Sequence, residues 1–511
     1  MTTRALAIAA LAATASACTK PNPEYCNDSN RQVCETGFVC DLDLNRCFPE
    51  PDASGDAMVD ASGGACQGDQ DCDNSSAPIC DEGSQTCRGC ATDSDCLRQG
   101  ANTPACAVDG RCIECAVDEH CESMICDVTA EACVAESLVV YVDSDGTDAV
   151  SCGTRAQPCQ TLTTALQRVT ISRNTVRMAP GDYTDEPTPV ALDAIDVVVH
   201  GPGADLSVLN GPGLDIRNSS KVEVRGLAIN APASGTGTRT GIAVSGSGTS
   251  LRVIASTIEA DYRGIACTGG AIITVEDSRF ENNGNDAIGA GLCSTTVLNS
   301  TFVGNYFGIQ AYGTLVVEGS EFTAHTIFPI IIYEGAEATI RRTLIRGNTN
   351  GFRAQGGDFT IENSFIVNNG TGTPGVFASG SNSTGTIRFS TIAGNTAADT
   401  DAGGVDCQSL GATDNVIVGE SSIVFGNSPA TQINCSGLWT YSDIEGGRIG
   451  TGNMDMDPLF VEEIGDYHLQ SGSPARDRAD PTATISHDFD GDARATDGRA
   501  DIGADEIVRQ R

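Results

Sequence analysis

The stretch NSTFVGNYFGIQAYGTLVVEGSEFTAH, residues 299–325, contains two copies of a short motif that decides the fold. The motif is a serine or threonine, any residue, an apolar residue, two further residues, and then Asn, Asp or His. Most copies are 20 to 23 residues apart. The apolar position is occupied in turn by Ile258, Phe280, Phe302, Phe322, Ile345, Ile366, Ile392 and Val424.

This period predicts a solenoid. One period holds three short strands with alternating apolar residues, separated by turns. Left-handed β-helices use strict hexapeptides, so the longer period indicates an all-β, right-handed parallel β-helix. We expect about ten coils over residues 181–450, stacked about 4.8 Å apart.

The last position of the motif forms a column that is mostly asparagine. We interpret it as an asparagine ladder at a tight turn, where Asn tolerates left-handed backbone and its amide bonds to neighbouring coils. Asp286, in NGNDAIGA, is placed at the usual glycine of NYFGI and is read as a turn variant. The ladder column is Asp261, Asn283, Asn305, His325, Asn348, Asn369, Asn395 and Asn427.

A second column lies two residues before the serine and should point outward. From Glu318 its charge alternates, through Arg341, Glu362, Arg388 and Glu420, which predicts an ion-pair ladder. The alternative is a glycosidase acid pair, Glu318 and Glu362, two coils apart. Arg341 between them would lower both pKa values, which is wrong for a general acid. The pair is therefore a weak catalytic candidate.

The strand after the asparagine turn provides a third outward column. Its charged members are Arg353 and Asp406, a second weak catalytic candidate, since neither a paired-aspartate strand nor Gly-His-Gly is present. The alternative is a shallow ligand groove lined by Gln310, Arg353, Phe377 and Asp406. The column is Ala266, Gly289, Gln310, Ile331, Arg353, Phe377, Asp406 and Asn434.

Six cysteines after residue 134 are expected to pair. Cys152 and Cys159 bracket a Gly/Pro loop, while Cys407 and Cys435 occupy equivalent positions in successive coils. Stacked equivalents lie within the Cα range that a disulfide accepts. Cys267 and Cys293 also lie in successive coils, offset by about three positions.

The solenoid needs a cap at its first coil. Residues 138–180 begin with a strand and continue into a helix whose Leu162, Ala165, Leu166 and Val169 share one face. Residues 451–511 form a closing segment. Its Asp488, Asp490 and Asp492 resemble part of a calcium loop, but the glycine falls too early, which favours capping turns. Calcium is the one cofactor considered, and the scattered histidines indicate no metal cluster.

The first 134 residues contain four groups of four cysteines. We expect disulfide modules at 26–48 and, three in a row, at 66–134, with pairing inside each module and a disordered linker at 49–65. The CxxC junctions Cys87–Cys90 and Cys112–Cys115 also fit a zinc ribbon. The groups are Cys26, Cys34, Cys40, Cys47; Cys66, Cys72, Cys80, Cys87; Cys90, Cys96, Cys106, Cys112; and Cys115, Cys121, Cys126, Cys133.

The N-terminus, MTTRALAIAALAATASAC, reads as a signal peptide over 1–17. Ordinary cleavage after Ala17 is one alternative. The other is a bacterial lipobox with Cys18 lipidated and 18–25 as a tether, and removing Cys18 from 23 cysteines leaves an even number. No later stretch can span a membrane. We therefore expect a lipid anchor at the outer membrane or cell surface, or otherwise secretion.

The charge excludes some partners. A formal net charge of -38 argues against nucleic acid and against anionic lipid or glycan surfaces. It permits divalent cations and neutral sugars. Aromatic residues are sparse, with Trp439 the one tryptophan, so no wide sugar-stacking platform is predicted.

The repeat resembles those of the pectate-lyase-like superfamily over residues 138–510. Residues 26–133 resemble the Dickkopf-like cysteine-rich repeats of exported bacterial proteins. The tail, DPLFVEEIGDYHLQSGSPARD followed by DFDGDARATDGRADIGADE, is similar to the closing segment of exported β-helix proteins. In pectate lyases and polygalacturonases a strand face carries clustered Asp, with Arg or Lys as the lyase base.

Taken together, the sequence favours a surface-anchored, non-enzymatic binding or adhesion protein for an extracellular glycan or surface partner. An extracellular polysaccharide lyase or glycoside hydrolase is the first alternative, and a structural envelope protein the second. The sequence makes no prediction of oligomeric state.

Overall fold

The computed structural model describes residues 38–41, 46–49 and 66–507, except 73–74, 82, 99–102, 187–188, 212, 233–238, 381, 399–400, 410–413, 463–464 and 495–497. The predicted signal peptide, Cys18, the predicted tether, most of the predicted first module and, apart from Pro49, the predicted linker lie outside the described residues. In the first of two units, residues 1–53, strand β1 (Phe38–Asp41) pairs antiparallel with β2 (Arg46–Pro49).

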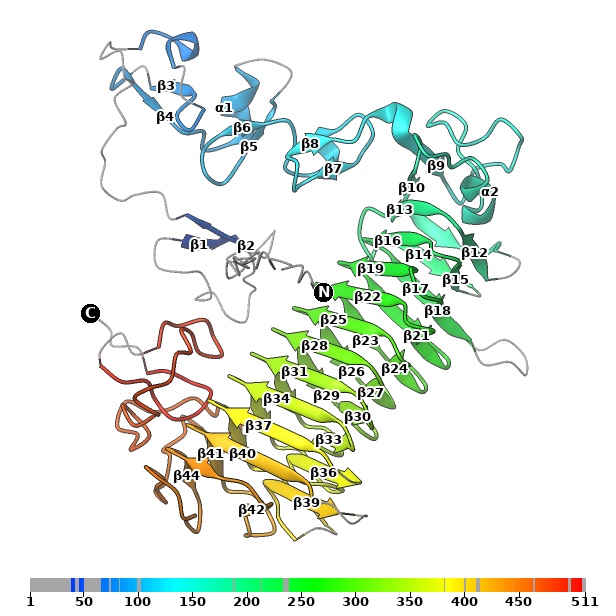
Figure 1. The fold of residues 1–511 in the computed structure, drawn as a ribbon. Coiled ribbons are helices and arrows are strands. Elements are labelled where there is room, and N and C mark those ends of the chain that lie inside the picture. The colour runs from blue at the N-terminus through cyan, green and yellow to red at the C-terminus, as the bar shows by residue number, and fades with distance from the viewer. Residues whose placement is uncertain are drawn as a thin grey trace, which may run out of the picture. The chain divides into compact units, whose positions relative to one another are not determined.

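The second unit contains a right-handed solenoid of three parallel sheets (Figure 1). The first sheet has 13 strands, the second 12 and the third 11, so the third holds one strand from each of 11 coils. Every neighbour in a sheet comes from the next coil. This is the predicted right-handed parallel β-helix.

The strands of the first sheet are β9 (Val139–Val142), β10 (Thr175–Met178), β13 (Asp196–His200), β16 (Lys221–Arg225), β19 (Ser250–Ile254), β22 (Ile272–Glu276), β25 (Ser294–Leu298), β28 (Thr314–Glu318), β31 (Glu337–Arg341), β34 (Asp358–Glu362), β37 (Thr384–Arg388), β40 (Val416–Glu420) and β43 (Trp439–Thr440).

Those of the second are β11 (Gly181–Tyr183), β14 (Ser207–Asn210), β17 (Ala228–Ala231), β20 (Thr257–Ala260), β23 (Arg279–Glu281), β26 (Thr301–Val303), β29 (Glu321–Thr323), β32 (Leu344–Arg346), β35 (Phe365–Val367), β38 (Thr391–Ala393), β41 (Ile423–Phe425) and β44 (Asp443–Ile444).

Those of the third are β12 (Val190–Asp193), β15 (Leu214–Arg217), β18 (Thr240–Ser245), β21 (Arg263–Thr268), β24 (Asp286–Ala290), β27 (Phe307–Ala311), β30 (Ile330–Tyr333), β33 (Phe352–Gln355), β36 (Val376–Gly380), β39 (Val405–Ser409) and β42 (Ile433–Asn434).

The motif places an apolar column inside the second sheet. Phe280, Phe302 and Phe322 pair in register and stack with ring centroids 4.9 and 4.5 Å apart. The serine of each copy forms a hydroxyl ladder: the backbone N–H of Ser256 donates to Ser278, and that of Ser278 to Ser300. Each hydroxyl therefore satisfies an amide of the coil before it, which explains the serine at every turn.

The asparagine ladder is present, but its rungs are not left-handed. The left-handed residue precedes the rung, as at Asn282 before Asn283 and Asn368 before Asn369. Asn283 donates to the side chain of Asn305 at 2.7 Å, and Asn348 to that of Asn369 at 2.9 Å. These side-chain bonds join successive coils and satisfy the amide N–H groups of the buried asparagines. At the ends of the column, Asp261 is exposed and Gln432 accepts from Asn427.

His325 interrupts this ladder. Its backbone N–H donates to Asn348, and its Nδ1 lies 3.3 Å from the carbonyl of Asn305. Its buried Nε2 has no partner among the described residues. Burial lowers the pKa of His325 to about 4, so the ring is neutral in the folded chain at neutral pH.

The helix of the N-terminal cap is shorter than the predicted face from Leu162 to Val169. Helix α2 spans Leu162–Leu166, so Val169 packs on the core from beyond the helix. Thr161 accepts from the N–H of Thr164, and Glu186 accepts from the N–H groups of the first turn. The three disulfides expected after residue 134 are present, with Cα distances of 4.9 Å (Cys152–Cys159), 6.3 Å (Cys267–Cys293) and 5.0 Å (Cys407–Cys435).

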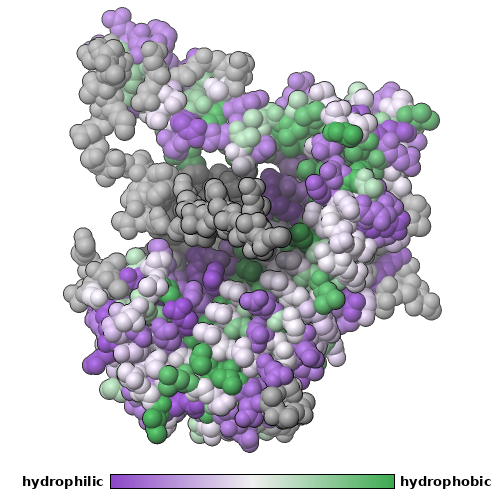
Figure 2. All heavy atoms as spheres, viewed as in Figure 1, coloured by the Kyte–Doolittle hydropathy of each residue, from purple (hydrophilic) through white to green (hydrophobic). Residues whose placement is uncertain are grey.

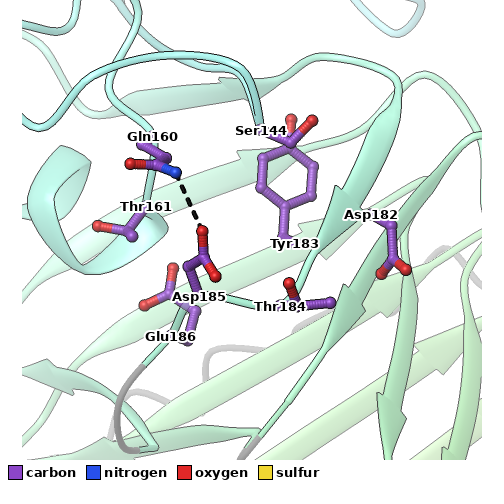
Figure 3. Close-up of a pocket in the computed structure, with 8 residues that line it drawn as sticks. All are labelled: Ser144, Gln160, Thr161, Asp182, Tyr183, Thr184, Asp185 and Glu186. Atoms are coloured by element: carbon purple, nitrogen blue, oxygen red, sulfur yellow. Dashed lines mark hydrogen bonds between the residues drawn. The ribbon is translucent and has the colours of Figure 1, made fainter.

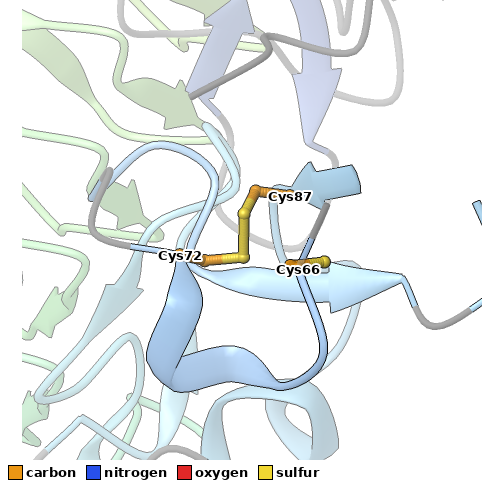
Figure 4. Close-up of side chains that lie close together, drawn as sticks. All are labelled: Cys66, Cys72 and Cys87. Carbon is orange, nitrogen blue, oxygen red and sulfur yellow. A yellow bond between two sulfur atoms is a disulfide. The ribbon is translucent and has the colours of Figure 1, made fainter. Parts of the chain in front are cut away.

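The three described modules share one plan. The first cysteine bonds the third and the second bonds the fourth: Cys66–Cys80 and Cys72–Cys87, Cys90–Cys106 and Cys96–Cys112, Cys115–Cys126 and Cys121–Cys133. Figure 4 shows Cys66 close to the Cys72–Cys87 disulfide. Disulfide sulfurs are not thiolates, so the zinc alternative does not apply to the cysteines of these three modules.

Each described module closes with a short antiparallel pair. In addition the modules contain one α-helix and two 3-10 helices. A third 3-10 helix, η3 (Glu136–Leu138), leads into the solenoid. The elements are η1 (Asp69–Asp71), β3 (Ile79–Asp81) and β4 (Thr86–Arg88); α1 (Asp93–Leu97), β5 (Ala105–Cys106) and β6 (Cys112–Ile113); and η2 (Asp118–His120), β7 (Cys126–Asp127) and β8 (Ala132–Cys133).

The acidic residues of the modules are structural. Asp69, Asp93 and Asp118 occupy equivalent positions, and each accepts the backbone N–H of its module's third cysteine at 2.7 to 2.9 Å. Asp71 accepts the N–H groups of Gln67 and Gly68, and Asp95 is bonded by Arg88. These bonds hold the loop between the first two cysteines, which accounts for the repeated Asp.

The closing segment lies along the second sheet. The outward residues of that sheet are mostly polar as far as Glu321 and become apolar at Phe365, Val367 and Ile423. Tyr467, Leu469, Ala475, Ile502 and Ala504 pack on them. The prediction of capping turns at the solenoid's end was therefore wrong for this part of the segment.

A buried arginine fastens the closing segment. Arg494 is fully buried, donates to Glu506 at 3.3 Å and to the side chain of Asn363 at 3.0 Å, and lies 4.6 Å over the ring of Phe389. Asp488 accepts from the backbone N–H groups of Asp492 and Glu506, both at 2.8 Å. The acidic residue Asp488 of the tail therefore has a structural role, because it joins two parts of the closing segment through these hydrogen bonds.

Candidate binding face

The third sheet assembles the candidate site (Figure 1). Its register pairs Gly289, Gln310, Ile331, Arg353 and Phe377 in successive coils, as the predicted column requires. Inward neighbours such as Ile309 and Ala354 are buried in the core. The column therefore points outward because strand side chains alternate between the two faces of a sheet.

Asp286 forms the floor of this face. It pairs in register with Phe307 and not with Gly308, so the sequence alignment that put it at the turn glycine was off by one residue. Its Oδ2 accepts from Arg263 Nε at 2.7 Å and its Oδ1 from the amide of Gln310. A Cβ at Gly289 would lie 2.7 Å from that carboxylate, so the glycine makes room for the pair.

Burial raises the pKa of Asp286 above its ordinary value, although Arg263 and Gln310 act in the opposite direction. The side chain is 1% exposed, and both of its oxygens already accept hydrogen bonds. It therefore orients its neighbours rather than presenting a free carboxylate.

Tyrosines border this floor. Tyr312 and Tyr333 occupy the same position in successive coils, and their rings stack with centroids 4.2 Å apart. Tyr333 donates its hydroxyl to Gln310 Oε1 at 2.8 Å. Tyr306 and Tyr312 are each 42% exposed. We call Arg263, Tyr306, Gln310, Tyr312, Tyr333 and Arg353, with Asp286 beneath them, the tyrosine face.

Arg353 lies between two phenylalanine rings, 5.1 Å from the centroid of Phe328 and 5.5 Å from that of Phe377. Its Nε donates to the hydroxyl of Ser379 at 3.0 Å. No carboxylate of the described residues forms an ion pair with it. The guanidinium is thus held flat by aromatic stacking and keeps further donors for a ligand.

Two predicted groove residues are not accessible. Phe377 is 6% exposed and packs under Arg353, while Asp406 is fully buried and accepts from Asn434 at 2.8 Å. Burial raises the pKa of Asp406. Of the proposed groove, Gln310 and Arg353 remain at the surface, so the Arg353–Asp406 catalytic candidate loses its acid.

Glu318 and Glu362 lie on the first sheet, on another side of the coils. Glu318 pairs with Arg342 at 2.5 Å, and not with Arg341 as expected, because Arg342 occupies the adjoining turn. Glu362 lies 3.7 Å from both Arg341 and Arg388, as the ladder predicts. Both carboxylates are therefore engaged with arginines, which favours the structural interpretation over the acid pair.

Two cavities lie elsewhere. One, of about 20 Å³ beside the cap, is surrounded by Asp182, Asp185 and Glu186, and Gln160 donates to Asp185 at 3.0 Å (Figure 3). That volume suits a single water. The other, of about 330 Å³, lies at the last coil beside Arg448, which donates to carbonyls of the final strand of the third sheet.

Sequence reasoning missed the tyrosines, Arg263 and the role of Asp286. A signal was present, since Tyr312 and Tyr333 are 21 residues apart, within one repeat length. The expectation of no aromatic platform came from composition, which does not register that one face collects the tyrosines. The side of the molecule seen in Figure 2 is mostly hydrophilic or intermediate, with hydrophobic groups between the hydrophilic ones.

One protein-family model matches part of the solenoid. Residues 199–318 match the model of the right handed beta helix region. The chain is similar to the pectate lyase Pel9A, with 14% identity, a TM-score of 0.45, and coverage of 73% of this chain and 98% of that one. The A-module of a mannuronan C-5 epimerase from Azotobacter vinelandii has 13% identity, a TM-score of 0.38, and coverage of 57% and 90%.

A third structure is the lacto-N-biosidase of Eubacterium ramulus, with 12% identity, a TM-score of 0.39, and coverage of 60% of this chain and 68% of that one. At these values the likeness concerns the fold alone. Among curated proteins no match is found. In the part of the chain that the structure describes, no helix is long and apolar enough to cross a membrane.

Proposed function

We propose that this chain is an extracellular, surface-anchored, non-enzymatic binding protein whose solenoid presents the tyrosine face to a glycan. The disulfides support an oxidising compartment outside the cytoplasm. The surface anchor rests on Cys18 and its lipobox-like sequence.

The observation that carries the proposal is the combination of half-exposed tyrosines with fixed polar groups. Tyr306 and Tyr312 offer apolar ring surface, while Arg263, Gln310 and Arg353 offer donors and acceptors whose positions are set by Asp286, Tyr333 and Ser379. Sugars present apolar C–H faces and hydroxyl groups, so they match such a surface. Prior ordering of these side chains reduces the entropy cost of binding.

The proposal is non-enzymatic because the acids are engaged. Asp286 accepts from two partners and Asp406 is buried, while Glu318 and Glu362 pair with arginines. Hydrolysis of a glycosidic bond needs two carboxyl groups flanking the bond. On the tyrosine face the described residues provide one, and it is buried.

The test is a panel of neutral and acidic polysaccharides offered to the purified full chain, scored for both binding and cleavage. We expect binding without cleavage, and at least a tenfold loss of affinity when Tyr312 and Tyr333 are both replaced by Ala. Ile272→Ala is the control, because Ile272 is an exposed apolar residue of the first sheet.

If the wild-type chain cleaves a polysaccharide and the Asp286→Asn variant does not, the non-enzymatic proposal is overturned. The chain would then be a polysaccharide lyase or glycoside hydrolase. Neither binding nor cleavage across the panel would favour the structural envelope protein. If replacing both Tyr312 and Tyr333 by Ala leaves the glycan affinity unchanged, the tyrosine face is not the binding site.

A further inference from the structure

Three side chains that are far apart in the sequence meet inside the closing segment. His468, Asp490 and Asp505 each bring one nitrogen or carboxylate oxygen within 4.8 Å of the others. His468 Nε2 lies 2.8 Å from Asp490 Oδ2. The histidines looked scattered in the sequence, so tertiary structure alone produces this cluster.

The backbone aims each of these groups. Asp490 lies in a turn that is closed by a bridge between His487 and Ala493 and by the bond from the N–H of Asp492 to Asp488. Asp505 is 8% exposed, and its Oδ2 accepts from the N–H of Leu469 at 2.6 Å. Its other oxygen accepts no hydrogen bond from the described residues. That oxygen can therefore accept a bond from a cation or a proton.

The surroundings of His468 also resemble those of a metal-binding histidine. Its Nδ1 contacts the carboxylate of Asp466, which leaves Nε2 as the atom that faces Asp490 and Asp505. Metal-binding histidines usually donate their other ring N–H to a carboxylate or carbonyl, which sets the ring orientation. Asp466 would therefore be a positioning residue, and the three inner atoms would be the ligands.

We propose that His468, Asp490 and Asp505 bind a divalent transition-metal ion such as Zn²⁺. A ring nitrogen with two carboxylates suits first-row transition metals, whereas Ca²⁺ takes six to eight oxygens. Ligand atoms bound at about 2.0–2.2 Å lie about 3.3–3.6 Å apart in a tetrahedral site. The His468–Asp490 contact must open slightly and the longest separation must close, which are small side-chain adjustments. A histidine nitrogen binds a metal ion only without its proton, so binding would release any proton held at Nε2.

Such an ion would link three parts of the closing segment, around residues 468, 490 and 505, next to the contacts that hold the segment on the second sheet. Tyr467, adjacent to His468, donates to Asn368, and Ala504, adjacent to Asp505, donates to the hydroxyl of Thr391. Because an ion that binds only the folded state stabilises it, metal would strengthen the attachment of the segment to the second sheet. The site is independent of the tyrosine face.

The test is isothermal titration of the EDTA-treated, dialysed full chain with Zn²⁺, with thermal melting in parallel under non-reducing conditions. We expect one Zn²⁺ per chain and a melting temperature raised by several degrees at saturation. Asp490→Asn and His468→Gln should each weaken binding at least tenfold, and Asp466→Asn by about tenfold. Glu462→Gln, an exposed carboxylate of the same segment, should leave binding unchanged.

The Co²⁺-loaded wild-type chain provides a measurement that does not depend on variants folding. Visible d–d absorption of a tetrahedral or five-coordinate ion, displaced by Zn²⁺, supports the site. A wild-type chain that takes up no Zn²⁺, or variants of His468 and Asp490 that bind it as tightly as wild type, would show an ion-pair cluster only. Uptake of Ca²⁺ but not Zn²⁺ at these residues would overturn the ion class.

Discussion

The second and third sheets both carry aromatic residues on their outward faces, yet only one of those faces is covered. On the second sheet Phe365 is 3% exposed because Tyr467 and Ala504 pack on it. On the third, Tyr306 and Tyr312 are 42% exposed, next to polar groups that are already ordered. On the second sheet the chain covers Phe365 with its own C-terminal segment, whereas the exposed tyrosines are the surface that we propose for a partner.

The largest expected effect on stability comes from loosening the closing segment that covers the second sheet. Arg494→Ala removes the cation that faces the buried Glu506 and several carbonyls, so we expect a loss of about 3–5 kcal/mol of unfolding free energy. Thermal melting and limited proteolysis of the closing segment measure it. Arg346→Ala, which removes an exposed pair with Glu321, should cost less than about 1 kcal/mol. Equal losses would mean that Arg494 does not fasten the segment.

The next prediction compares the two faces directly. Phe365→Ala should cost about 3–4 kcal/mol because it leaves a cavity under the closing segment. Tyr312→Ala should cost less than about 1 kcal/mol, because the side chain is already 42% exposed and its removal leaves no buried cavity. Urea unfolding of both variants tests the difference. A large loss in Tyr312→Ala would show that the tyrosine face is covered in the intact protein.

The third prediction concerns the coils themselves and neither outward face. It follows from the buried histidine His325. The pKa of His325 is about 4 in the fold and about 6.5 when unfolded, so the unfolded chain binds more protons between these values. Stability from this group is complete above pH 6.5 and falls as the pH drops toward 4. The loss is about 2 kcal/mol at pH 5.

His325→Asn restores an asparagine rung that can accept from the N–H of Asn305 and should reduce this acid sensitivity. Melting at pH 7 and pH 5 measures it. His200, whose pKa burial lowers to about 3, provides a residual slope in both proteins. An unchanged difference between the two pH values in the variant would count against the buried neutral histidine.

The smallest effect is expected on the first sheet. Glu362→Gln removes a solvent-screened partner of Arg341 and Arg388, so stability should change by less than about 1 kcal/mol, and less still at high salt. Glycan binding should be unchanged, in contrast to the tyrosine variants. A loss of binding or of cleavage in this variant would return Glu362 to the list of functional residues.

The repeat was readable because each coil repeats the same local physics. A serine hydroxyl, a buried ring and an amide rung recur at one spacing, and stacking neighbours reinforce it, so the register from Ile258 to Val424 could be predicted residue by residue. The same register placed the outward columns. It failed at Asp286, where a one-residue shift turned a buried acid into an apparent turn variant.

The burial of Phe377 and Asp406 could not be read from the register, because alternation decides which way a side chain points and not what covers it. The site in the closing segment was equally hidden. His468, Asp490 and Asp505 belong to no repeat and have no fixed spacing.

By itself, then, the sequence determined the coil, its register, the solenoid disulfides and the outward columns, because these depend on interactions between residues one repeat apart. Tertiary structure alone decided three outcomes: the described part of residues 460–507 packs on the later strands of the second sheet, the tyrosines near the third sheet remain exposed, and His468 meets two aspartates. These outcomes depend on where a non-repeating segment folds back, and the physical reason is long-range packing of apolar surface, which leaves no periodic trace in the chain.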